Sequence, residues 1–183
     1  MRIVAGAFKG RRLRSPGWEG LRPTSDRLRE TLFDILGAAI QDARVLDGYA
    51  GTGAIGIEAL SRGAAQVTFV ENDHRAAKLI EQNLALLAIP AAPVGRDPQG
   101  GHVNIRSGFR GLTEASFDVI VLDPPYAPEA AAEALAAAAG LLAPSGRLVV
   151  EHAARHAPPA AHGRLRLQRT VTAGDSALSF YGF

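Results

Sequence analysis

Cysteine is absent from this chain of 183 residues, which excludes disulfide bonds and zinc sites built from thiolates. Long hydrophobic runs are also missing. The longest apolar stretch, residues 130–143, is too short to span a membrane and contains Glu133. The first six residues lead straight into a basic segment, so we expect no signal peptide. Together these absences predict a cytoplasmic protein that does not enter the membrane.

The length and the 47% hydrophobic content are sufficient for one domain with a full core. Charge is unevenly distributed along the chain. The first 30 residues contain eight Lys or Arg and three Asp or Glu, which gives a net charge of +5. The remainder of the chain contains twelve Lys or Arg and fifteen Asp or Glu, which gives a net charge of −3. This asymmetry favours an anionic partner such as nucleic acid over a merely solvated surface. The candidate contacts to that partner are Lys9, Arg11, Arg12, Arg14 and Arg22.

Hydrophobic periodicity predicts strands that alternate with helices. Residues 2–14 suit a short hairpin, and Thr24 or Ser25 can cap a helix that continues with Asp26 in its first turn. We predict further helices over residues 54–61, 74–88 and 129–142. The predicted strands are 44–47, 67–71, 103–106, 117–123, 147–151, 165–172 and 177–183, the last two forming a hairpin around Gly174 and Asp175. This alternation indicates βαβ units and an α/β fold with a parallel sheet.

A glycine turn follows the first of these strands. Residues 45–53 read Val-Leu-Asp-Gly-Tyr-Ala-Gly-Thr-Gly, and Glu71 lies 20 residues after Gly51 at the tip of the next strand. The pattern also satisfies the dinucleotide fingerprint, but no Gly-Lys-Ser/Thr follows, which excludes a P-loop. We expect Asp47, four residues before Gly51, to project an open carboxylate into the cleft, where it would suit the positive amino group of S-adenosylmethionine and repel a pyrophosphate. The candidate cofactor residues here are Asp47, Tyr49, Ala50, Gly51, Thr52, Gly53, Glu71 and its neighbour Asn72.

Two further strand ends carry candidate site residues. Ser107 and Gly108 follow the third strand, where an adenine ring would be contacted. Asp123, Pro124, Pro125 and Tyr126 follow the strongly apolar fourth strand and form the candidate catalytic site. The Asp123 carboxylate and the Pro124 carbonyl suit the two N–H groups of a planar amine, and Tyr126 can stack on a base that has left its stack. Such a motif predicts methyl transfer to an exocyclic amine.

Two other features carry weaker signals. His152 and His156 have the i, i+4 spacing of a metal pair, but Pro158 and Pro159 favour a loop there, so we expect no metal. Residues 90–101 form a long connection that is rich in Pro and Gly. A surface loop without a specific role is the simplest explanation for it.

Taken together, the quoted motifs resemble those of the bacterial RsmD family, the 16S ribosomal RNA guanine-N2 methyltransferases. The segment Arg22-Pro23-Thr24-Ser25-Asp26-Arg27 is the most discriminating, with support from residues 2–13, 47–53, 58–64 and 123–126. The resemblance implies a Rossmann-like methyltransferase sheet of seven strands, mostly parallel with an antiparallel last strand, plus a small N-terminal hairpin and helix. The expected division is an extension over residues 1–42 and an S-adenosylmethionine-dependent domain over residues 43–183.

The resemblance also implies a reaction and a partner. One methyl group would be transferred from S-adenosylmethionine to N2 of one guanine in 16S ribosomal RNA, within an assembled or partly assembled small subunit. Thr24 and Arg27 would lie near the methionine end of the cofactor. Ser107 departs from the family, in which Asp or Asn is frequent at that position. Other interpretations remain open: methylation of adenine N6 or of a protein glutamine, an NAD-dependent oxidoreductase, and a non-catalytic RNA-binding protein.

Overall fold

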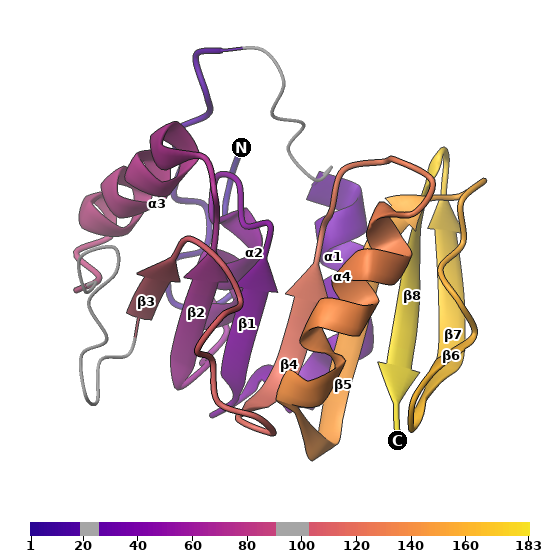
Figure 1. The fold of residues 1–183 in the computed structure, drawn as a ribbon. Helices are drawn as coiled ribbons and strands as arrows, with labels where there is room; N and C mark the ends of the chain where they lie inside the picture. The colour runs from indigo at the N-terminus through magenta and orange to yellow at the C-terminus, as the bar shows by residue number, and fades with distance from the viewer. Residues whose placement is uncertain (19–25, 91–102) are drawn as a thin grey trace. The chain divides into compact units, whose positions relative to one another are not determined.

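The computed structural model of the protein describes residues 1–18, 26–90 and 103–183. The chain forms two compact units, Met1–Gly108 and Phe109–Phe183. Figure 1 shows the helices and strands that make up each unit. The division at residues 42 and 43 that the sequence predicts lies within the first unit and stays a prediction.

The first unit is built on three parallel strands. Its elements are α1 (Asp26–Leu36), a 3-10 helix (Gly37–Ile40), β1 (Arg44–Gly48), α2 (Ala54–Ser61), β2 (Gln66–Val70), α3 (His74–Leu86) and β3 (Val103–Arg106). β2 lies between β1 and β3, in a register that aligns Gly48 with Val70 and Val70 with Arg106. The residues that follow the three strands therefore lie along one edge. α2 packs on β1 and β2, whose apolar side chains are buried.

The N-terminal segment forms the short hairpin that the sequence predicts. Arg2 and Arg12 make an antiparallel bridge. Inside it, the amide of Ile3 donates to the Arg11 carbonyl at 3.0 Å, and the amide of Gly10 donates to the Ile3 carbonyl at 2.9 Å. Ile3 and Leu13 are buried, while the basic side chains between them are exposed. Apolar residues thus attach the hairpin to its unit, and its charges face solvent.

The second unit combines a parallel pair with an antiparallel meander. Its elements are β4 (Phe117–Leu122), α4 (Ala130–Ala138), a 3-10 helix (Ala139–Leu141), β5 (Leu142–Ala153), β6 (Ala161–His162), β7 (Leu165–Ala173) and β8 (Ser176–Gly182). β4 pairs with β5 in parallel, β8 runs antiparallel to β5, and β7 runs antiparallel to β8. α4 packs on β4 and β5. The predicted hairpin around Gly174 and Asp175 is confirmed.

Two predictions about the second unit were wrong in their boundaries. The helix predicted over 129–142 ends at Ala138, and the strand predicted to begin at Arg147 begins at Leu142. The register with β4 changes between Phe117 and Val119, from Leu142 to Arg147. The residues between these partners, including Pro144 and Gly146, therefore form an irregularity within β5. Pro and Gly commonly occupy such positions in a strand, where they also resemble a turn.

The predicted α/β class, with a mostly parallel sheet and an antiparallel last strand, is confirmed. All seven predicted strands are present, and β6 adds a two-residue strand. In the described part of the chain, every helix is too short or too polar to cross a membrane. His152 lies in β5 with its Nε2 atom 2.9 Å from the Ser179 Oγ atom, and His156 lies in the turn after β5, so the two do not share a helix face.

Candidate active site

The glycine turn between β1 and α2 has a backbone conformation that few residues adopt. Tyr49, Gly51 and Gly53 all have positive φ angles, of 62°, 55° and 76°. The turn is closed by the Gly53 amide, which donates to the Ala50 carbonyl at 2.8 Å. A positive φ is readily available to glycine but unusual for tyrosine, and residues in such conformations concentrate at functional sites. The turn therefore brings five predicted cofactor residues together at the end of β1: Tyr49, Ala50, Gly51, Thr52 and Gly53.

Asp47 lies beneath this turn rather than open in a cleft. Its side chain is only 1% exposed, and its Oδ2 atom accepts a hydrogen bond from the Gly56 amide at 2.8 Å. Gly56 is the third residue of α2, where backbone N–H groups have no partner inside the helix. Burial raises the pKa of Asp47 to about 8, although the Gly56 hydrogen bond opposes the shift. The expectation of an open carboxylate was thus wrong, and its predicted role toward the cofactor stays a prediction.

Glu71 connects the glycine turn to the end of β2. Its Oε2 atom accepts from the Gly51 amide and its Oε1 atom accepts from the Asp73 amide, both at 2.8 Å. These two bonds fix the carboxylate at the edge of the sheet. Because each carboxylate oxygen accepts more than one hydrogen bond, Glu71 retains capacity for hydroxyl groups of a ligand.

The remaining predicted cofactor residues lie along the same edge or away from it. Asn72 is exposed two residues after the end of β2, Ser107 is exposed directly after β3, and Gly108 is half-buried. The Glu71 carboxylate and the glycine turn fit a ligand with ribose hydroxyls, as S-adenosylmethionine has. Arg27 has an exposed side chain in the first turn of α1. Thr24 and Arg22 lie outside the described residues.

The candidate catalytic motif begins where β4 ends. Leu122 pairs with Val150 of β5, so Asp123, the first residue after β4, follows beside Glu151, which lies within β5. The Ala127 amide donates to the Pro125 carbonyl at 2.8 Å, which tightens the loop after the motif. Asp123 is half-buried and Pro124 is buried. The rings of Pro124 and Pro125 fix φ at two positions, and together with the Ala127 hydrogen bond they restrict the conformation of the loop.

Tyr126 is oriented by a contact that the sequence did not predict. Its hydroxyl donates to the Glu151 Oε1 atom at 2.8 Å and lies 2.7 Å from the Ser176 Oγ atom. Burial raises the pKa of Tyr126 well above its usual range, and the Glu151 carboxylate adds to this shift while Ser176 opposes it. Because tyrosine has one hydroxyl proton, Ser176 donates in the second contact. Glu151 is 4% exposed, and a lone acid at the end of an apolar strand is the only sequence signal for it.

The basic N-terminal residues lie in the hairpin and the segment after it. Arg11 Nη2 donates to the Leu86 carbonyl at 2.8 Å, and Arg14 Nη1 donates to Gln82 Oε1 at 3.3 Å. Both contacts reach the last turns of α3, where cations are favourable. The exposed members of the predicted RNA-binding set are Lys9, Arg11, Arg12 and Arg14.

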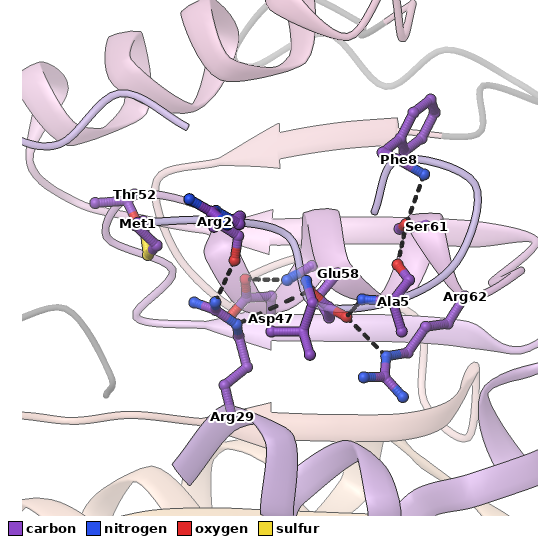
Figure 2. A network of polar contacts seen from close by, with 12 residues as sticks. Met1, Arg2, Ala5, Phe8, Arg29, Asp47, Thr52, Glu58, Ser61 and Arg62 are labelled. Carbon is purple, nitrogen blue, oxygen red and sulfur yellow. Dashed lines mark hydrogen bonds and ion pairs between the residues drawn. The ribbon is translucent and has the colours of Figure 1, made fainter. Parts of the chain in front are cut away.

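A buried carboxylate on α2 holds the start of the hairpin, as Figure 2 shows. Glu58 accepts from the amides of Val4 at 2.8 Å and Ala5 at 2.9 Å. Arg62 Nε donates to Glu58 Oε1 at 2.8 Å, and Arg29 Nε lies 3.9 Å from Glu58 Oε2. An acid in the middle of an apolar helix, four residues before an arginine, was the available sequence signal for this network.

Gly6 is required by the same attachment. It has a φ of 81°, and a Cβ atom at this position would lie 1.7 Å from the Ser61 carbonyl oxygen. The neighbouring Ser61 Oγ atom accepts from the Phe8 amide at 2.9 Å and donates to the Ala5 carbonyl. Glu58 and Ser61 of α2 therefore bind the backbone of the hairpin, and its basic side chains remain outside the core.

Comparison with known proteins identifies the family. A family model described as "Conserved hypothetical protein 95" matches residues 1–182. The Escherichia coli (strain K12) protein "Ribosomal RNA small subunit methyltransferase D" is 36% identical over 184 residues, covering 99% of this chain and 89% of that protein. The solved structure of the Escherichia coli protein yhhF is 34% identical, with a TM-score of 0.80 and coverage of 99% and 96%.

A more distant structure shares the fold. It is an RNA methyltransferase from Salinibacter ruber in complex with S-adenosyl-L-homocysteine, 18% identical, with a TM-score of 0.63 and coverage of 87% of this chain and 92% of that one. The family model and the Escherichia coli relative both extend over nearly all of the sequence. The chain therefore belongs to the RsmD family, the family of the ribosomal RNA small subunit methyltransferase D proteins.

Proposed function

We propose that this protein transfers a methyl group from S-adenosylmethionine to the exocyclic N2 of a single guanine in 16S ribosomal RNA. The observation that carries the proposal is the relationship along 99% of the chain to a ribosomal RNA small subunit methyltransferase. The motif Asp123-Pro124-Pro125-Tyr126 at the end of β4 supports the choice of a planar amine. We further propose that the RNA is met in the cytoplasm, in an assembled or partly assembled small subunit.

The first unit supplies the residues proposed to hold the cofactor. Glu71 would accept hydrogen bonds from the ribose hydroxyls, and the glycine turn lets the backbone approach the ligand closely. When bound, S-adenosylmethionine supplies an electrophilic methyl group on a sulfonium. Asp47 fixes the start of α2 through Gly56, so it sets the position of the turn whether or not it touches the ligand.

The second unit supplies the residues proposed for the amine. The N2 lone pair of guanine is delocalised into the ring, so the nitrogen is a poor nucleophile. Hydrogen bonds from its two N–H groups to the Asp123 carboxylate and the Pro124 carbonyl would orient the nitrogen. The negative charge of Asp123 would also stabilise the positive charge that develops on nitrogen during the displacement.

Tyr126 would support the guanine itself. A base that is modified on its edge must leave its stack, and an aromatic ring replaces part of the stacking that it gives up. Because Glu151 and Ser176 hold the hydroxyl group, the orientation of the ring is fixed before the base arrives. This arrangement lowers the entropy cost of binding.

Nucleoside analysis by mass spectrometry tests the proposed function. Small-subunit RNA from a strain that lacks this gene should contain one N2-methylguanosine fewer per molecule than RNA from the parent strain. Restoring the gene should restore the nucleoside, whereas restoring it with Asp123→Ala should not. An unchanged N2-methylguanosine content, or a loss of methylated adenine instead, would refute the proposal.

A further inference from the structure

Asn83 is a fully buried polar residue in α3 that lies outside the predicted site. Its side chain is 0% exposed. Its Oδ1 atom accepts from the Arg14 amide at 2.7 Å, and its Nδ2 atom donates to the Arg14 carbonyl at 3.3 Å and to the Thr52 carbonyl at 3.0 Å. Both amide hydrogens and the carbonyl oxygen therefore have partners. Burying an amide costs free energy unless it is bonded in this way.

The partners of Asn83 belong to two segments with different proposed roles. Arg14 follows the basic hairpin, and Thr52 is the middle residue of the Gly-Thr-Gly turn. These segments are separated by 38 residues in the sequence, and one side chain joins their backbones. A second contact joins the same regions, because the Thr52 hydroxyl lies 3.9 Å from the Met1 sulfur.

Residues 11–18 lie along α3 and contact it on both sides of Asn83. Arg11 reaches the Leu86 carbonyl at the end of the helix, and the Arg75 guanidinium lies 5.1 Å from the centre of the Trp18 ring near its start. Arg14 lies between them, beside Gln82 and Asn83. The buried side-chain amide of Asn83 therefore binds both residues 11–18, through the Arg14 backbone, and the glycine turn, through the Thr52 carbonyl.

We propose that Asn83 is a positioning residue that sets the basic N-terminal segment and the cofactor turn relative to one another. The proposal rests on the proposed function for the identity of the two ligands. If Asn83 acts in this way, its removal loosens both the turn and the segment, and cofactor binding and RNA binding weaken together. A residue that served packing alone would need no amide, since a leucine of similar volume fills such a position at lower cost.

Binding measurements on Asn83→Leu test this inference. Removal of its hydrogen bonds leaves the Thr52 carbonyl and the Arg14 amide without a buried partner, so we expect the affinity for S-adenosylhomocysteine to fall about five- to tenfold. The affinity for small-subunit RNA should fall by a similar factor. The matched control is Ser61→Ala, which frees the Phe8 amide of the same hairpin but lies at the far end of α2 from the turn. It should weaken RNA binding alone.

Amide hydrogen exchange on the wild-type protein gives a second readout that does not depend on a folded variant. Ordering of the turn by S-adenosylhomocysteine should slow exchange of the Arg14 amide several-fold, through Thr52 and Asn83, and leave the Phe8 amide unchanged. Unaltered exchange at Arg14, or an Asn83→Leu variant that binds S-adenosylhomocysteine as wild type does, would overturn the inference. The exchange of the Arg14 amide and the affinity for S-adenosylhomocysteine are both measured without RNA. A wild-type protein that binds this ligand but no RNA therefore refutes the proposed substrate and leaves the role of Asn83 toward the turn to be judged by these two measurements.

Discussion

The acidic residues beside the glycine turn act on the backbone of the protein itself. Asp47 accepts from Gly56, and Glu71 accepts from both Gly51 and Asp73. A sequence motif identifies such acidic residues, because an acid near the end of a strand is easy to recognise. The motif does not reveal how deeply the carboxyl group is buried, and burial affects its pKa. For Asp47 burial is nearly complete, and it raises the pKa to about 8.

The raised pKa of Asp47 predicts a pH-dependent stability of the cofactor-free protein. The folded chain keeps the Asp47 proton up to about pH 8, whereas an unfolded aspartate loses it near pH 4. The unfolded state therefore binds fewer protons across this window, and this group destabilises the fold as pH rises. Asp47→Asn keeps an acceptor for Gly56 without titrating. In urea unfolding, the free energy of unfolding of the variant should increase relative to that of wild type by up to about 1.4 kcal/mol per pH unit between pH 5 and 8.

The control for this experiment is Glu30→Gln on the exposed surface of α1. Its difference from wild type should remain constant over the same pH range. A difference between Asp47→Asn and wild type that is equally constant would mean that Asp47 is ionised in the folded protein.

Several important contacts were beyond reach of the sequence, for a physical reason. Glu58 binds the amides of Val4 and Ala5, which lie 54 and 53 residues away, and Asn83 binds Arg14 across 69 residues. Local patterns predict which residues share a helix face or follow a strand. They do not predict which backbone groups a distant side chain meets. Asp123 and Glu71 were recognisable because their positions depend on strand ends, whereas Glu58, Asn83 and Glu151 depend on tertiary packing.

At the scale of elements, periodicity located almost every strand and helix of the described chain. The helix predicted over residues 54–61 and the strand over residues 103–106 have the predicted bounds. The start of β5 was missed, because Pro144 and Gly146 mark turns far more often than irregular strands. The N-terminal hairpin and the segment after it carry the basic side chains, and α2 and α3 hold their backbone through Glu58 and Asn83. Apolar and backbone contacts hold the hairpin, so its exposed arginines are available to a partner.

Substitution of Arg11, Arg12 and Arg14 together by Gln tests this element. The variant should bind small-subunit RNA more weakly. The slope of log affinity against log salt should become shallower by about 0.7–0.9 for each phosphate that the variant no longer neutralises. Affinity for S-adenosylhomocysteine should change little, because Asn83 bonds to the backbone of Arg14 and not to its side chain.

A matched variant removes three arginines elsewhere. Arg164, Arg166 and Arg169 are exposed in and beside β7 of the second unit. Their replacement lowers the net charge by the same amount, but the salt slope should stay near that of wild type. Equal changes in both variants would show that RNA responds to net charge only and that the N-terminal segment has no special role.

At the scale of the whole molecule, the proposed roles divide between the two compact units. The residues proposed for the cofactor lie in Met1–Gly108, and those proposed for the amine lie in Phe109–Phe183. The first 30 residues, which belong to the first unit, carry a net charge of +5, and the rest of the chain carries −3. Each unit stabilises its own residues: the contacts described for Asp47 and Glu71 lie within the first unit, and those for Tyr126 lie within the second. Cofactor binding and amine chemistry should therefore be separable by mutation.

Asp123 is the residue at which this separation is tested most directly. Its carboxylate is proposed to act on the amine as positive charge develops, so Asp123→Ala should lower the single-turnover methylation rate at saturating RNA by about 10²–10³-fold. Calorimetry should find binding of S-adenosylhomocysteine close to that of wild type. Asp123→Asn retains one acceptor without the charge and should give an intermediate rate. Equal damage from both substitutions would identify charge as the essential property. An alanine variant with the wild-type rate would contradict the proposed role of the motif, and one that no longer binds S-adenosylhomocysteine would contradict the division between the units.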